Sequence, residues 1–160
     1  MHSTLTKPVL LFALLAAIPS AASATTATTS FAVSATVAET CTVSAAALDF
    51  GSYAVASASA ATTTVTVTCT NGTTYHVALD DGDNFTTTRR MVSNVTNFLE
   101  YELYTDAGHT TRWGNTEATD VDGTGNGSAQ ALTVYGLVPS GQFVTAGSYS
   151  DTINVTVTYP

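Results

Sequence analysis

The chain has 160 residues and carries four Lys and Arg against twelve Asp and Glu, a formal net charge of −8. So few positive side chains cannot form the basic face that nucleic acid or an anionic membrane requires, and neither is expected as a partner. Beyond the first 24 residues, β-branched Thr and Val abound and good helix formers are scarce, which predicts an all-β protein.

The first 24 residues have the features of a secretory signal peptide. Lys7 gives a short positive start, residues 9–18 are uninterruptedly apolar, and Ala22-Ser23-Ala24 supplies a small-residue cleavage site. The apolar run is too short to span a bilayer, which needs about 20 residues. We therefore expect residues 1–24 to be removed on export, leaving residues 25–160 as one domain.

The segment directly after this leader has the alternation of a β-strand. Its apolar row consists of Phe31, Val33, Ala35 and Val37, separated by small or polar residues. A free N-terminus is usually polar and frayed, whereas an apolar strand needs a sheet edge. The segment can pair within its own domain or add to the sheet of a neighbouring subunit, and its residues alone leave both options open.

Cys41 and Cys69 are the two cysteines of the chain. In an oxidising compartment such a pair is expected to form a disulfide. Closing a loop of this length stabilises a fold by about 3–4 kcal/mol in the chain-entropy model. Two cysteines without a matching histidine cluster do not make a zinc site, so no metal is expected.

The rest of the chain alternates repeatedly with a period of two and shows no sustained helical stripe. Asn71-Gly72 signals a tight turn, while residues 80–84 and 122–128 are predicted to be polar or glycine-rich loops. Several short strands on a chain of this size favour a two-sheet sandwich. The predicted strands cover residues 41–43 with a continuation at 48–50, then 64–69, 75–79, 99–103, 132–136 and 153–159.

Two features have the residue types of binding or catalytic sites. His76 and His109 have no linked nucleophile or carboxylate motif, so both are expected to be surface histidines. The segment from Asp120 to Gly125 begins like a calcium loop, but Ala131 stands where the EF-hand pattern needs a bidentate Glu. A flexible loop is the better interpretation.

Two other features could belong to a sugar site. Glu100 and Glu102 alternate on one predicted strand about 7 Å apart, near the spacing of glycosidase carboxylates. Trp113 can line a sugar-binding surface, but it can equally fill a sandwich core. Because no acid, base and nucleophile can be assembled, neither an enzyme activity nor a cofactor is expected.

Several short motifs follow one another in order beyond the leader. They are CTV at 41–43, LDFGSY at 48–53, VTVTCT at 65–70, YELY at 101–104, WG at 113–114, VYG at 134–136 and GSYSDTINVTVTY at 147–159. By their order and spacing the chain resembles the spore coat U domain family, the pilins of archaic chaperone–usher systems. The second and the last motif carry most of this resemblance.

The resemblance implies an immunoglobulin-like β-sandwich that lacks its last strand and is completed by a donor strand from a neighbouring subunit. Residues 25–38 would be the donor strand and residues 39–160 the pilin domain. The donor side chains would be Phe31, Val33, Ala35 and Val37. An edge of the acceptor groove, contacted first by a chaperone, would be formed by Ile153, Val155, Val157 and Tyr159.

The implied function is that of a structural pilin, which polymerises head to tail with identical subunits into an extracellular fibre for adhesion or biofilm formation. The implied partners are a periplasmic chaperone, an outer-membrane usher and a tip adhesin, and the route leads through the periplasm to the cell surface. The alternative is a tip adhesin or a secreted carbohydrate-binding module of the same fold. One departure is Pro160, which lacks the N–H that pairing near a C-terminal anchor would use.

Overall fold

The computed structural model describes residues 22–94 and 96–160. The predicted signal peptide, residues 1–24, lies almost wholly outside the described residues and stays a prediction. The chain divides into two units, Met1–Ala35 and Thr36–Pro160. Within the described part of the chain, no helix is long and apolar enough to cross a membrane.

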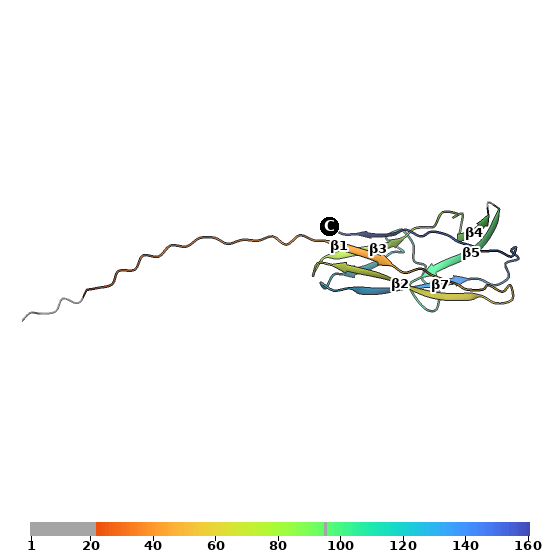
Figure 1. The fold of residues 1–160 in the computed structure, drawn as a ribbon, viewed down its shortest axis with the longest axis horizontal. Helices are drawn as coiled ribbons and strands as arrows, with labels where there is room; N and C mark the ends of the chain where they lie inside the picture. The colour runs from red at the N-terminus through yellow and green to blue at the C-terminus, as the bar shows by residue number, and fades with distance from the viewer. Residues whose placement is uncertain (1–21, 95) are drawn as a thin grey trace, which may run out of the picture. The chain divides into compact units, whose positions relative to one another are not determined.

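The second unit consists of two antiparallel sheets, as predicted (Figure 1). One sheet has the strand order β1-β2-β7-β5-β4 and the other has the order β6-β3-β8. Residues 22–94 and 96–160 contain no helix. The strands are β1 (Cys41–Ala45), β2 (Ser59–Cys69), β3 (Thr74–Leu79), β4 (Arg89–Asn94), β5 (Asn97–Tyr104), β6 (Val121–Thr124), β7 (Gln130–Val138) and β8 (Val155–Thr158).

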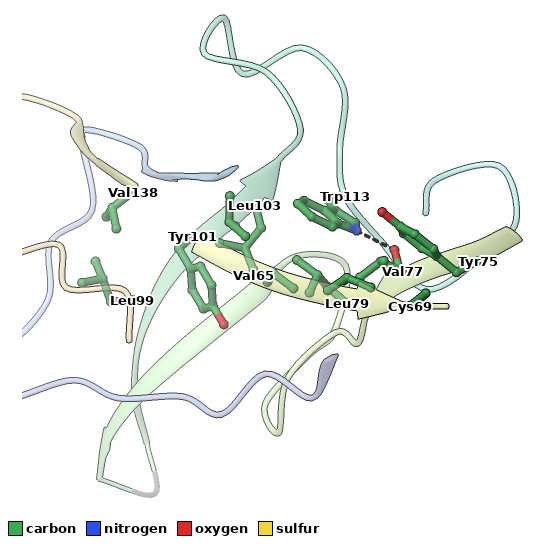
Figure 2. Close-up of a cluster of buried hydrophobic side chains, with 12 residues drawn as sticks. Val65, Cys69, Tyr75, Val77, Leu79, Leu99, Tyr101, Leu103, Trp113 and Val138 are labelled. Atoms are coloured by element: carbon green, nitrogen blue, oxygen red, sulfur yellow. Dashed lines mark hydrogen bonds between the residues drawn. The ribbon is translucent and has the colours of Figure 1, made fainter. Parts of the chain in front are cut away.

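The core lies between the sheets and is made from the alternate, inward-facing side chains of the central strands (Figure 2). Val65 and Val67 come from β2, and Val77 and Leu79 come from β3; all four are buried. Each such side chain stabilises the fold by about 1.5–3 kcal/mol when it is fully buried. Trp113 is also buried, and its indole Nε1 donates a hydrogen bond of 2.8 Å to the carbonyl of Val77. It is therefore a core residue and not part of a sugar-binding surface.

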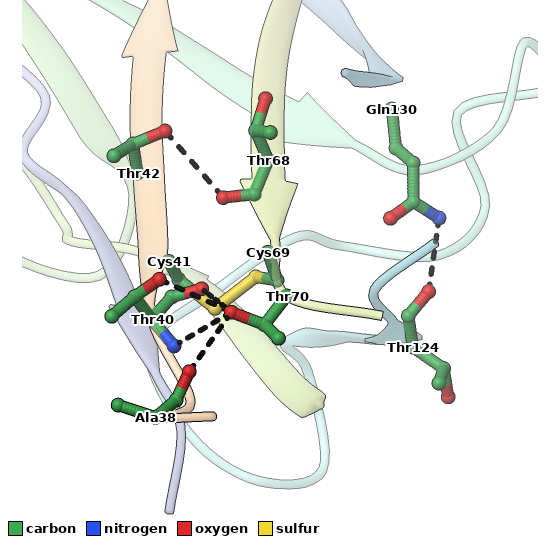
Figure 3. The surroundings of a disulfide bond; sticks show 9 residues. All are labelled: Ala38, Thr40, Cys41, Thr42, Thr68, Cys69, Thr70, Thr124 and Gln130. Carbon is green, nitrogen blue, oxygen red and sulfur yellow. Dashed lines mark hydrogen bonds between the residues drawn. A yellow bond between two sulfur atoms is a disulfide. The ribbon is translucent and has the colours of Figure 1, made fainter. Parts of the chain in front are cut away.

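The predicted disulfide between Cys41 and Cys69 is present (Figure 3). The two cysteines are direct partners in the register of β1 and β2. Just beyond them, the amide of Thr70 donates a hydrogen bond of 2.9 Å to the carbonyl of Thr40, which extends the pairing by one step. The disulfide therefore fastens β1 to β2 at one end of the strand.

The prediction that a strand resumes at residues 48–50 is wrong. Pairing of β1 with β2 ends at Ala45, and the next residues fold inward over β7. A Cβ atom built on Gly136 would lie 2.6 Å from the Leu48 side chain and 2.7 Å from the Phe50 ring. These two side chains occupy the space above the glycine, so the segment packs onto the sheet instead of extending it.

Two strands were not predicted: β4, which follows the polar loop at residues 80–84, and β6, which overlaps the glycine-rich loop at residues 122–128. β6 can extend into the glycine-rich segment because Gly123 allows the close approach of Tyr75: a Cβ there would lie 2.3 Å from the tyrosine ring. β4 follows the polar stretch and starts with Arg89, whose side chain is completely buried. Glycine and arginine are weak signals for strands, which is why the alternation pattern missed both.

At the ends of the domain, one segment is not a strand within the single chain and one strand is shorter than predicted. The segment from Phe31 to Val37 forms no strand; a lone segment has no neighbour to satisfy its backbone groups, and a strand requires one. At the other end, β8 covers Val155–Thr158, shorter than the predicted 153–159. Strand ends are the least predictable part of such patterns.

Candidate functional site

The candidate site lies where the two sheets end next to each other. β1 is the last strand of one sheet, β8 is the last strand of the other, and the two lie close together. Among the described residues, each of them is paired with one strand only, β1 with β2 and β8 with β3. Each strand therefore has one edge of backbone N–H and C=O groups without a partner strand.

The inward face of β1 is uncovered. Val43 lies directly opposite Val67 of β2, and residues opposed in this way point to the same face of a sheet. Val67 has none of its surface exposed, whereas Val43 keeps 39 %. Ala45 is likewise exposed although its partner Val65 is buried. The interior at this edge thus lacks a covering layer.

The inward face of β8 is also incompletely covered. Val155 lies opposite Leu79 and Val157 lies opposite Val77, so both valines face the interior. Their partners on β3 are buried, but Val155 and Val157 are only half-buried, and Tyr159 is exposed. The predicted alternation around Val155 and Val157 is therefore correct, and these two inward-facing side chains are incompletely covered.

A groove of about 290 Å³ opens between these two edges, and we call it the open groove. A wider hollow of about 690 Å³ adjoins it and shares part of its lining. Most of the open groove's lining is apolar, which suits an extended segment with apolar side chains at alternate positions. Its lining includes Ala45, Leu48 and Phe50 at the end of β1 and after it, Tyr149, Ile153 and Val155 before and in β8, and Val65, Leu79 and Leu103 from the core.

One wall of the open groove is built by the LDFGSY motif. Phe50 packs edge-on against Tyr101 of β5, with ring centroids 5.9 Å apart. Phe50 and Leu48 both lie over Gly136, and Ser59 donates a hydrogen bond of 2.9 Å to the carbonyl of Phe50. Two motifs that are far apart in the sequence, LDFGSY and VYG, therefore meet at this wall.

The opposite wall is fixed by two carboxylates. The hydroxyl of Tyr101 donates to Asp151 at 2.7 Å, and the amide of Asp83 donates to the same carboxylate at 3.0 Å. The amide of Asn154 donates to Asp80 at 3.0 Å. Burial, followed by the contact with Asp151, raises the pKa of Tyr101 well above its ordinary value. These bonds set the path of the chain into β8.

A buried cluster of charges lies near this wall, and sequence reasoning missed it. The guanidinium of Arg89 is fully buried, pairs with Glu102 and donates to the carbonyl of Leu79 at 3.1 Å. Glu102 also accepts a hydrogen bond of 2.9 Å from Arg112. Glu102 thus serves the structure, and Glu100 is exposed, so the two carboxylates do not form a glycosidase pair.

The predicted donor residues are available for contact. Phe31 and Val33 are almost completely exposed, with 86 % and 84 % of their surface accessible, and Val37 is similar at 79 %. Ala35 is exposed as well. Nothing in the single chain tests whether this row enters a groove, so its role stays a prediction.

Comparison with known protein families matches residues 27–156 to the Spore Coat Protein U domain. The chain belongs to this family. Protein U of Myxococcus xanthus is 42 % identical over 64 residues, which cover 40 % of this chain and 36 % of that protein. The chain thus spans well under half the length of this Spore Coat Protein U relative.

A solved structure is also similar to this Spore Coat Protein U domain. It is the crystal structure of the CsuC–CsuE chaperone–tip adhesion subunit pre-assembly complex from archaic chaperone–usher Csu pili of Acinetobacter baumannii. The TM-score is 0.61 at 23 % identity, and the match covers 76 % of this chain and 40 % of that chain. This likeness shows the fold, an immunoglobulin-like β-sandwich.

Proposed function

We propose that this chain is a structural subunit of a surface fibre, in which residues 25–38 of one copy fill the open groove of the next. The observation that carries the proposal is the incomplete burial of inward-facing side chains on both edges: Val43 on β1 and Val155 on β8. A strand inserted between these edges completes both sheets and covers both side chains.

The N-terminal segment has the properties that such a strand needs. Residues 25–38 contain no charged residue, which suits an apolar groove. Phe31, Val33, Ala35 and Val37 recur at every second position, so these four side chains all point into the groove when the backbone pairs with β1 and β8. Full burial of a Val or Phe side chain stabilises the contact by about 1.5–3 kcal/mol, and the main-chain hydrogen bonds of the two edges add to it.

The same geometry supports a chaperone as a partner before assembly. A lone subunit exposes an apolar groove and two unpaired strand edges, which favour aggregation unless a partner covers them. The similar solved structure is described as a chaperone–subunit pre-assembly complex of a chaperone–usher pilus. By this likeness, a periplasmic chaperone occupies the open groove, and an outer-membrane usher then exchanges it for the N-terminal segment of the next identical subunit. A tip adhesin would form the end of the fibre that is distant from the cell.

Deletion of residues 25–37 tests the proposal. The truncated chain is expected to bind its chaperone, because its groove is intact, but it should not extend fibres. Assembly is measured by electron microscopy and by the ladder of polymers that resists dissociation in detergent. Continued polymerisation of the truncated chain would rule out the donor role.

A matched pair of substitutions tests the same segment without shortening it. Val33→Asp places a charge on the inward row and should block insertion, whereas Ser34→Asp places the same charge on the opposite face. Equal loss of fibres in both variants would contradict the proposed register.

A self-complemented version of the protein provides a third test. It carries a second copy of residues 25–38 after Pro160, joined by a flexible Gly/Ser linker. Because the added segment fills the protein's own groove, this version should be monomeric and should unfold at a higher temperature than the unmodified chain. An unchanged unfolding temperature would count against the groove as the binding site.

A further inference from the structure

Three side chains with metal-binding atoms meet on the outer face of the β6-β3-β8 sheet. His76 of β3 lies directly opposite Asp122 of β6, and its Nδ1 atom is 2.6 Å from the Asp122 Oδ1 atom. Asp120, just before β6, places its Oδ2 atom 3.8 Å from the same nitrogen. The ligand atoms of all three residues lie within 4.8 Å of one another.

The charge balance of this cluster favours a cation. It combines two carboxylates with one imidazole, and within residues 22–94 and 96–160 no Lys or Arg side chain forms an ion pair with Asp120 or Asp122. The three arginines of the chain are engaged elsewhere: Arg89 and Arg112 pair with other acids, and Arg90 stacks on Phe98.

Asp120 provides a second, independent observation. Its side chain is only 11 % exposed, and its Oδ1 atom is buried without a hydrogen-bond partner among the described residues. Buried carboxylate oxygens are normally paired, because an unpaired one loses its hydration without compensation. A cation bound by both oxygens of this carboxylate would supply the missing partner of Oδ1.

We propose that His76, Asp120 and Asp122 bind a divalent transition-metal ion of the Zn²⁺ type. Imidazole nitrogen and carboxylate oxygen together suit Zn²⁺, whereas Ca²⁺ and Mg²⁺ prefer oxygen ligands alone. Three protein ligands leave a fourth position for water. A neutral imidazole that binds the ion through Nδ1 carries its proton on Nε2, so the ion replaces the hydrogen bond between His76 and Asp122.

The bound ion would join β6 to β3. β6 has four residues and is paired with β3 only, so a link between His76 and Asp122 fastens one of the two edge strands of this sheet. Because the ion binds the folded chain, it raises stability by mass action. The two aspartates lie on the side of β3 away from β8, so Zn²⁺ binding does not depend on whether the open groove takes up a strand.

Titration of the metal-free protein with ZnCl₂ tests the proposal. The protein is purified as the assembly that its cells export, treated with a chelator and dialysed. Binding of Zn²⁺ is then measured by isothermal titration calorimetry. We expect one Zn²⁺ ion per chain and a higher unfolding temperature with Zn²⁺. His76→Gln and Asp122→Asn should each weaken the affinity about tenfold or more, while His109→Gln, at the other histidine of the described chain, should leave it unchanged.

Three outcomes would overturn the proposal. The first is the absence of saturable Zn²⁺ binding, which would make the cluster a hydrogen-bonded pair with a neighbouring acid. The second is unchanged affinity in both His76→Gln and Asp122→Asn. The third is equally tight binding of CaCl₂, which would exclude a site that depends on imidazole. Since both substituted residues are exposed, circular dichroism of the metal-free variants should match that of the unsubstituted protein.

Discussion

The hydroxyl of Tyr101 donates a hydrogen bond of 2.7 Å to Asp151, and this bond joins the middle of β5 to the segment that leads into β8. Tyr101 is buried and also packs against Phe50. One side chain therefore contacts both walls of the open groove. The spacing of these walls depends on the contact, and so does the fit of any strand between them.

Tyr101→Phe should lower the free energy of unfolding by about 1–2 kcal/mol, because Asp151 loses a hydrogen bond in a partly buried place. The measurement is urea denaturation of the self-complemented protein, followed by circular dichroism. Tyr135→Phe is the control, since it removes a hydroxyl from the outer side of β7 and should change stability by less than about 0.5 kcal/mol. Similar losses in both variants would show that the bond to Asp151 does not stabilise the groove.

The raised pKa of Tyr101 predicts alkaline destabilisation. In the unfolded chain this phenol loses its proton at about pH 10, whereas burial and Asp151 keep it protonated to higher pH in the folded chain. The unfolded state therefore binds fewer protons above about pH 10, and stability falls as the pH rises. The unfolding midpoint of the self-complemented protein should fall less steeply with pH in Tyr101→Phe than in Tyr135→Phe. Equal slopes would contradict this assignment.

Arg89→Met should destabilise the domain by about 3–5 kcal/mol. The substitution removes the charge that compensates Glu102 and also the donors to the carbonyls of Leu79 and Asp80. Its neighbour Arg90 offers a matched control, because it stacks on Phe98 and has no carboxylate partner in the described chain. Arg90→Met should cost about 1 kcal/mol or less. Denaturation midpoints that rank the two variants in the opposite order would be inconsistent with a structural role for the buried charge.

Val155→Asp should prevent the open groove from accepting a strand, whereas Thr156→Asp should not. Val155 faces the interior opposite Leu79, and Thr156 points to the other side of β8 and is exposed. A charge buried beneath an inserted apolar strand is strongly unfavourable. The test is polymer formation in cells that produce each variant, with chaperone-bound protein quantified in parallel. Normal fibres from Val155→Asp would show that β8 does not border the groove that is used.

The alternation pattern predicted the central strands well, because a strand with one buried face must place apolar residues at every second position. It failed at β4, where Arg89 occupies an inward position. An arginine there is tolerated only because Glu102, 13 residues further along, is brought beside it. It also failed at β6, where Gly123 allows Tyr75 to approach closely. In both cases the compensating partner is distant in the sequence, so no local pattern could indicate it.

The candidate site was predicted in part. The C-terminal row containing Val155 and Val157 could be recognised as a strand with an inward face. The position of Phe50 in the opposite wall could not be predicted, because it results from the packing of Phe50 over Gly136 of β7. The donor role of Phe31 to Val37 came from a family resemblance and stays a prediction.

The sequence by itself determined which side chains share a face, since successive residues of a strand point to opposite sides whatever their neighbours are. It also determined the partner of Cys41, because the chain has a single pair of cysteines. Only the tertiary structure decided which strand edges remain unpaired and that His76 meets Asp122, 46 residues away. Strand order and register result from packing between distant segments, and that packing leaves the apolar row of β8 half-covered beside the open groove.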